Sequence, residues 1–136
     1  MAEAASVSFP HECCGILIGA ERGGCVRLTR AVHAANVVPA AVRRRRFEID
    51  PAALIAVQRQ LRDAGGRERL IGYFHSHPFG PLRPSAADLA GAHETGLVAV
   101  IVTPSGRTGR AGFGIWLRFG QGPARRFRPL ALRGVV

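Results

Sequence analysis

The sequence predicts an α/β fold, formed as a single domain over residues 1–136, with a mixed, mostly antiparallel sheet flanked by helices. The length of 136 residues lies within the usual range of one compact domain. A hydrophobic fraction of 47% with 21% charged residues is the ordinary mixture of a globular protein. Short apolar runs typical of strands alternate with helical segments, and Gly or Pro separates them.

Seven stretches have the composition of strands, because each is rich in apolar or β-branched residues and is bounded by Gly, Pro or polar residues. They are residues 14–19, 25–32, 47–49, 70–75, 97–102, 112–119 and 126–132. A turn over residues 21–24, which contains two glycines, joins the first two strands as a hairpin. Pro104-Ser105-Gly106 should join the fifth strand to the sixth. The last stretch contains two arginines and Pro129, which favours an edge position.

Two segments carry the start signals of helices. Asp50 and Pro51 supply an N-cap and a first-turn proline, and the glycine pair at 65–66 ends that helix. Ser85 supplies a second N-cap, with Asp88 three residues later, where a carboxylate suits the positive end of a helix. We therefore expect one helix that begins after Asp50. We expect a second, short helix over residues 86–92, which begins after Ser85.

The cysteine count and the hydropathy restrict the compartment. Cys13, Cys14 and Cys25 are an odd number, and the N-terminus has no signal-peptide pattern, so we expect reduced, buried cysteines in a cytoplasmic protein. No apolar run reaches the roughly 18 residues that a membrane-spanning helix needs, so no membrane partner is expected.

The formal charge of +10 comes from 19 basic residues, all of which are arginine. Such a surface attracts polyanions, which are nucleic acids or acidic proteins. The composition of the genome explains an arginine-only, alanine-rich chain equally well. Nucleic acid is therefore the less favoured partner, although the charge does not exclude it. The run Arg43–Arg46 has either a solvated role or a role beside a substrate groove.

Residues 75–78, with the sequence His-Ser-His-Pro, and the SxxD segment that follows indicate chemistry. On an extended strand, residues two apart face the same side, so His75 and His77 can direct two imidazoles to one point. On a helix, residues three apart are neighbours, so Ser85 and Asp88 share a face. We expect these two elements to converge on one metal ion.

Two imidazoles and a carboxylate suit zinc, and three protein ligands leave a fourth position open, as in catalytic zinc sites. Zinc lowers the pKa of a bound water to about 7 and polarises a carbonyl, so it supplies a nucleophile and a Lewis acid together. We therefore expect one Zn²⁺ per chain, held by His75, His77 and Asp88. Iron and other divalent ions also accept such ligands and stay open as alternatives.

The complete pattern, HSHP with SxxD at this offset, resembles the signature of the JAMM, or MPN-plus, metallopeptidase family in its compact bacterial form. Residues 10–19, PHECCGILIG, are similar to an upstream segment of that family that carries a glutamate, here Glu12. Residues 45–51 and 71–74 also resemble the family, so the similarity covers residues 10–117. It implies an MPN/JAMM-like fold, which is a cytidine-deaminase-like sandwich.

The resemblance also implies a role for each matched residue. His75, His77 and Asp88 bind zinc. Glu12 takes a proton from the attacking water, and Ser85 stabilises the tetrahedral oxyanion. A carboxylate can accept that proton and return it to the leaving amine, and a hydroxyl aimed at developing charge stabilises it electrostatically. Sequence spacing alone does not place Glu12 near the other four residues.

The chain departs from the family before Glu12, where only 11 residues stand in place of a first strand and most of a helix. The resemblance therefore implies a shortened N-terminal element. Loss of a covering helix would expose apolar surface, which a second subunit can cover, so a homo-oligomer is one expectation.

The resemblance implies a deubiquitinase-like zinc metallopeptidase. Its reaction would be hydrolysis of a peptide or isopeptide bond after the C-terminal Gly-Gly tail of a ubiquitin-like or sulfur-carrier protein. The alternative is a noncatalytic MPN-type binding or scaffold module that uses its basic surface. The intact set of two histidines, aspartate, serine and glutamate favours the enzyme, because a scaffold does not need them together.

Overall fold

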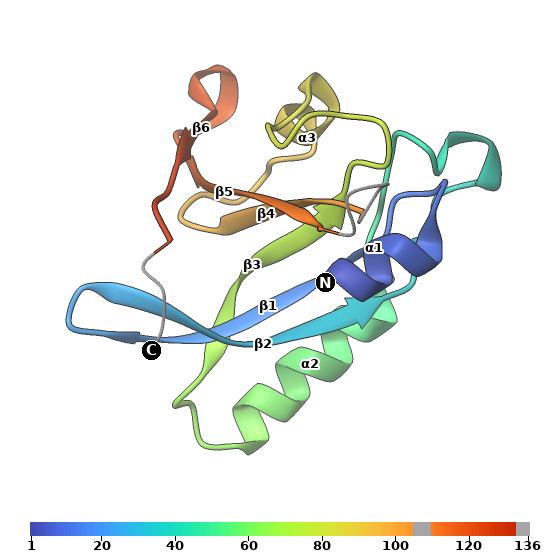
Figure 1. Cartoon of the computed structure of the whole chain (residues 1–136). Helices are drawn as coiled ribbons and strands as arrows, with labels where there is room; N and C mark the ends of the chain where they lie inside the picture. The colour runs from blue at the N-terminus through green and yellow to red at the C-terminus, as the bar shows by residue number, and fades with distance from the viewer. Residues whose placement is uncertain (105–109, 133–136) are drawn as a thin grey trace.

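The computed structural model describes residues 1–104 and 110–132 and has an α/β fold built on a six-stranded sheet (Figure 1). The strand order is β2-β1-β3-β4-β5-β6. Strands β3 and β4 pair in parallel, and every other neighbouring pair in the sheet is antiparallel. The predicted fold class, with a mixed and mostly antiparallel sheet, is confirmed.

The elements alternate along the chain much as the sequence predicts. The helices are α1 (Ala2–Ser8), α2 (Pro51–Asp63) and α3 (Ala86–Ala90), with short 3-10 helices η1 (Ala40–Val42) and η2 (Gly122–Ala124). The strands are β1 (Cys14–Arg22), β2 (Cys25–Ala34), β3 (Arg69–Ser76), β4 (Val98–Thr103), β5 (Gly112–Phe119) and β6 (Arg126–Pro129). Among the described residues, no helix has the length and apolar character to cross a membrane.

The first hairpin is confirmed, and its strands reach the turn itself. Arg22 pairs with Cys25, and Gly23 and Gly24 between them have φ angles of 59° and 72°, which favour glycine. Cys25 at this turn is exposed, so the expectation that all three cysteines are buried is wrong for it. A hairpin tip has no layer of structure above it to cover the side chain.

Three other predicted elements differ in extent. Residues 47–49 do not form a strand, because only Ile49 pairs, in an isolated bridge with Asn36. The helix predicted over 86–92 ends at Ala90, and the edge strand predicted over 126–132 ends at Pro129. Ser105 and Gly106 of the predicted turn lie outside the described residues.

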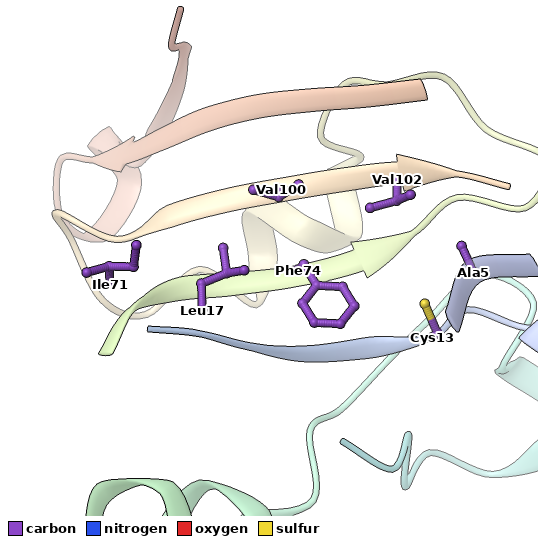
Figure 2. Packing of buried hydrophobic residues seen from close by; sticks show 7 residues of the cluster. All are labelled: Ala5, Cys13, Leu17, Ile71, Phe74, Val100 and Val102. Carbon is purple, nitrogen blue, oxygen red and sulfur yellow. The ribbon is translucent and has the colours of Figure 1, made fainter. Parts of the chain in front are cut away.

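Two apolar clusters hold helices against the two faces of the sheet. On one face, Ala5 of α1 packs with residues of β1, β3 and β4, as Figure 2 shows. The buried members of this cluster are Ala5, Cys13, Leu17, Ile71, Phe74, Val100 and Val102. On the other face, Val57 and Leu61 of α2 pack on Ile16 and Ile18 of β1. The helix α1 thus covers the end of the first face.

Candidate metal centre

His75 and His77 come together where β3 ends. His75 is the penultimate residue of β3, and both imidazoles are buried. Their Nε2 atoms lie 3.0 Å apart. Ser76 between them is fully buried, and its Oγ accepts a hydrogen bond from the backbone N–H of Cys13 at 2.9 Å. The serine of the motif therefore joins the end of β3 to the start of β1.

Asp88 reaches the same point from α3. Ser85 Oγ accepts the N–H of Asp88 at 3.1 Å, and the carboxylate of Asp88 accepts the N–H of Ser85 at 2.6 Å, which forms a capping box. The two carboxylate oxygens of Asp88 lie 3.1 Å from His75 Nε2 and 3.3 Å from His77 Nε2. The predicted convergence of the strand end and the helix start is therefore present in the structure.

The donor atoms of His75, His77 and Asp88 all lie within 4.8 Å of one another. His77 Nδ1 lies 2.8 Å from the carbonyl oxygen of Pro81. Because a carbonyl only accepts, His77 carries its proton on Nδ1, which leaves the Nε2 lone pair directed at the centre. Two inward nitrogens and one carboxylate fit the ligand preference of zinc.

Electrostatics at the centre follow from burial and from close pairing. Burial lowers the pKa of His75. Burial acts in the same direction on His77, but its contacts with Asp88 and with the carbonyl of Pro81 outweigh it and raise the pKa. For Asp88, burial would raise the pKa, yet hydrogen bonds to both histidines lower it strongly. Asp88 is therefore ionised and acts as an anionic ligand group.

The pairing of β1 with β3 places Glu12 at the same site. Cys14 pairs with His75, and the N–H of Ser76 donates to the carbonyl of Cys13 at 2.9 Å. Glu12 directly precedes β1, and it lies close enough to His77 and Asp88 for their charges to act on its carboxyl. The Glu12 side chain is 6% exposed. Burial raises its pKa to about 7, against attraction by His77.

Two surface cavities flank these residues, and Phe9 lines both. One contains Glu12, His33, Asn36 and Arg43. The other contains His77, Pro78, Gly80 and Thr103. Glu12 thus lines one surface cavity and His77 lines the other.

The sequence analysis missed two residues at this site. Phe47 stacks on the imidazole of His75, with ring centroids 4.3 Å apart and an interplanar angle of 19°. Asn36 holds the backbone carbonyl of Glu12 with its side-chain amide at 3.0 Å. A weak sequence signal pointed to Phe47, because it follows the arginine run within a segment that resembles the JAMM family. No sequence pattern pointed to Asn36.

Residues 1–114 match the family described as prokaryotic homologs of the JAB domain. The chain belongs to this family. The predicted JAMM, or MPN-plus, membership is confirmed. A curated JAB relative, the desampylase of Haloferax volcanii, is 34% identical over 105 residues, which are 77% of this chain and 71% of that protein.

Two solved structures share the JAB fold of this chain. A protein from Desulfitobacterium hafniense has a TM-score of 0.77 and 24% identity, and the match covers 100% of this chain and 88% of that one. A protein from Salinibacter ruber has a TM-score of 0.64 and 29% identity, with 94% and 80% covered. These likenesses agree with the six-stranded sheet of the JAB domain described above.

Proposed function

We propose that this JAB-family chain is a zinc-dependent peptidase that cleaves the peptide or isopeptide bond after the C-terminal Gly-Gly tail of a ubiquitin-like or sulfur-carrier protein. The observation that carries the proposal is the convergence of His75, His77 and Asp88, with the buried Glu12 close enough to His77 and Asp88 for their charges to act on it. A binding module has no need for a buried general base beside an inward-facing metal-ligand set. The desampylase relative supports hydrolysis of the isopeptide bond of a ubiquitin-like protein as the reaction.

His75, His77 and Asp88 would hold the zinc ion, since their donor atoms come together at one point. When bound, zinc supplies Lewis acidity toward a carbonyl and lowers the pKa of water. The chain's own base is Glu12. From its place near His77 and Asp88, its carboxylate can accept a proton from the attacking water and return it to the leaving nitrogen.

Ser85 is the proposed oxyanion donor. Its Oγ accepts the N–H of Asp88, so the hydroxyl hydrogen stays available to donate. Its side chain is also exposed, so a substrate carbonyl can reach it. The same cap that orients Asp88 thus aims a hydroxyl toward the place where negative charge develops.

Selection for Gly-Gly is a matter of access. The carbonyl under attack must come close to a centre whose two histidines are buried. A residue without a side chain permits that approach, and an extended tail occupies the least width. Glycine on the acyl side of the scissile bond therefore acts as a steric filter.

The test uses the zinc-loaded protein and a sulfur-carrier protein with extra residues fused after Gly-Gly. A matched fusion carries Gly-Val in place of Gly-Gly. We expect kcat/KM to be much higher for the Gly-Gly fusion. Equal cleavage of both fusions would show a general peptidase, and cleavage of neither by protein that holds zinc would favour the binding module.

A further inference from the structure

Asn36 makes four hydrogen bonds with its side-chain amide, which is all that an asparagine can make. Nδ2 donates to the carbonyl of Glu12 at 3.0 Å and to the carbonyl of Arg46 at 3.1 Å. Oδ1 accepts the N–H of Val38 at 3.3 Å and the N–H of Glu48 at 3.2 Å. One side chain therefore ties three separate stretches of backbone together.

These bonds clamp Glu12 from both sides. Its carbonyl is held by Asn36, and its own N–H donates to the carbonyl of Arg43 at 2.7 Å. Both backbone groups of Glu12 are thus fixed by the segment 36–48 rather than by a sheet ladder. The direction of the Glu12 carboxyl depends on that segment.

The same segment, residues 36–48, also positions Phe47 beside the metal centre. Asn36 bonds to Arg46 and Glu48, the residues on each side of Phe47. The Phe47 ring lies nearly parallel to the imidazole of His75 at 4.3 Å. A ring in that place restricts rotation of His75, since the imidazole cannot turn without losing the stacked contact.

We propose that Asn36 is a positioning residue that holds Glu12 and His75 in one frame, and that Phe47 carries its effect to His75. The proposal rests on the proposed function for its catalytic consequence, because Glu12 and His75 act there as base and ligand. Its structural content is that a single side-chain amide positions two groups of the site that are far apart in the sequence. Neither residue touches the reacting atoms.

The first experiment measures zinc affinity by competition with a chromogenic chelator. Phe47→Leu should weaken zinc binding by about 10- to 100-fold, the range for loss of a group that orients a metal ligand. Phe47→Tyr should restore it, because the stacked ring returns. The control is Phe119→Leu in β5, at the sheet end opposite the site, which should leave affinity unchanged. Affinity in Phe47→Leu equal to that of the wild type would overturn the role of Phe47.

The second experiment separates Asn36 from Phe47. Asn36→Ala should weaken zinc binding and also lower kcat, since it releases both His75 and Glu12. Phe47→Leu, reloaded with saturating zinc, should recover most of its kcat. Asn36→Asp retains the acceptor oxygen but loses both donors, so it should behave like Asn36→Ala. Gln60→Ala on the exposed side of α2 is the matched control. A kcat in zinc-saturated Asn36→Ala equal to that of the wild type would refute the shared frame.

A third measurement needs neither zinc nor turnover. In the metal-free protein, the ring protons of His75 should show an upfield NMR shift from the stacked Phe47 ring. This shift should disappear in Phe47→Leu and diminish in Asn36→Ala. An unchanged shift in Asn36→Ala would refute the proposal. A wild-type protein that binds no zinc would instead count against the proposed function.

Discussion

Glu12 supplies what the metal ligands cannot, which is a group that takes up and returns a proton. We expect Glu12→Gln to reduce kcat by about 10²- to 10⁴-fold, the usual contribution of general acid–base catalysis. Zinc should remain at one ion per chain, because the substitution removes no ligand. The measurements are turnover of the Gly-Gly fusion and metal content. Loss of zinc in the variant would make Glu12 a ligand, and full turnover would remove its role.

The same carboxyl makes the stability of the metal-free protein depend on pH. Burial raises the pKa of Glu12 from 4.5 to about 7 in the fold. Between these values the folded state holds a proton that the unfolded chain has lost. The associated stability is therefore present below pH 4.5 and is lost as pH rises through 7, by at most about 3 kcal/mol.

Urea unfolding in the presence of a chelator, at several pH values from 5 to 8, checks this effect. Glu12→Gln has no such proton, so its free energy of unfolding should decline less over this range than that of the wild type. The difference between the two proteins isolates Glu12 from the histidines, which titrate in both. Parallel curves would contradict the raised pKa.

At the scale of residues, what the sequence predicts depends on distance along the chain. His75 lies in β3 and His77 directly follows that strand, and Ser85 caps the helix that carries Asp88, so local periodicity was enough to group them. Glu12 comes near them only through the tertiary fold, by the pairing of β1 with β3 and by its backbone bonds to Asn36 and Arg43. Only the family resemblance pointed to it. Asn36 was not predicted, because its four hydrogen-bond partners lie in separate segments of the chain that have no periodic pattern.

At the scale of elements, α3 is a short helix whose first turn carries two functional groups. Ser85→Ala should lower kcat by about 10²- to 10³-fold if the hydroxyl is a single oxyanion donor. It should also cost about 1 kcal/mol of stability as a lost N-cap. Asp88 should keep its orientation, because it accepts the backbone N–H of Ser85, which the substitution retains.

Asp50→Ala provides a matched control for that prediction. Asp50 caps α2 by accepting the N–H of Ala52 at 2.9 Å, and it is not among the proposed site residues. Its removal should cost similar stability without a comparable fall in kcat. If both variants lose the same fraction of turnover, the effect of Ser85 is one of helix stability alone.

Capping residues also explain which elements the sequence predicted well. Both N-caps lie where expected, since Asp50 and Ser85 accept hydrogen bonds from their own helices. The strand predicted over residues 47–49 is absent because tertiary contacts hold this segment in another conformation. The N–H of Glu48 bonds to the side chain of Asn36, and the ring of Phe47 packs on His75. These contacts replace the ladder that composition alone would favour.

At the scale of the whole molecule, part of the arginine excess lies beside the proposed site. Arg43 lines the same cavity as Glu12, and its Nε donates to the carbonyl of Val38 at 2.8 Å. Arg44 and Arg45 follow it and are exposed. The run therefore places positive charge at the rim of the proposed tail-binding region, as a partner for an acidic protein surface.

Replacement of Arg44 and Arg45 by Ser should raise KM for an acidic carrier protein and flatten the dependence of KM on salt. Removal of charges at the rim weakens long-range attraction, which salt screens over about 10 Å at 0.1 M. Arg43 is retained, since its side chain also holds the loop beside Glu12. The measurement is KM at several salt concentrations, with kcat expected to stay the same.

The control makes the same change in charge elsewhere. Arg22 ends β1, and Arg67 precedes β3, so both lie at the sheet end away from His75. Their replacement by Ser should change KM and its salt slope less than the Arg44 and Arg45 pair does. Equal slopes for both double variants would mean that net charge acts as a whole. A slope unchanged from the wild type in both would leave the arginine run as a solvated surface, because attraction that depends on position must weaken where the charge is removed.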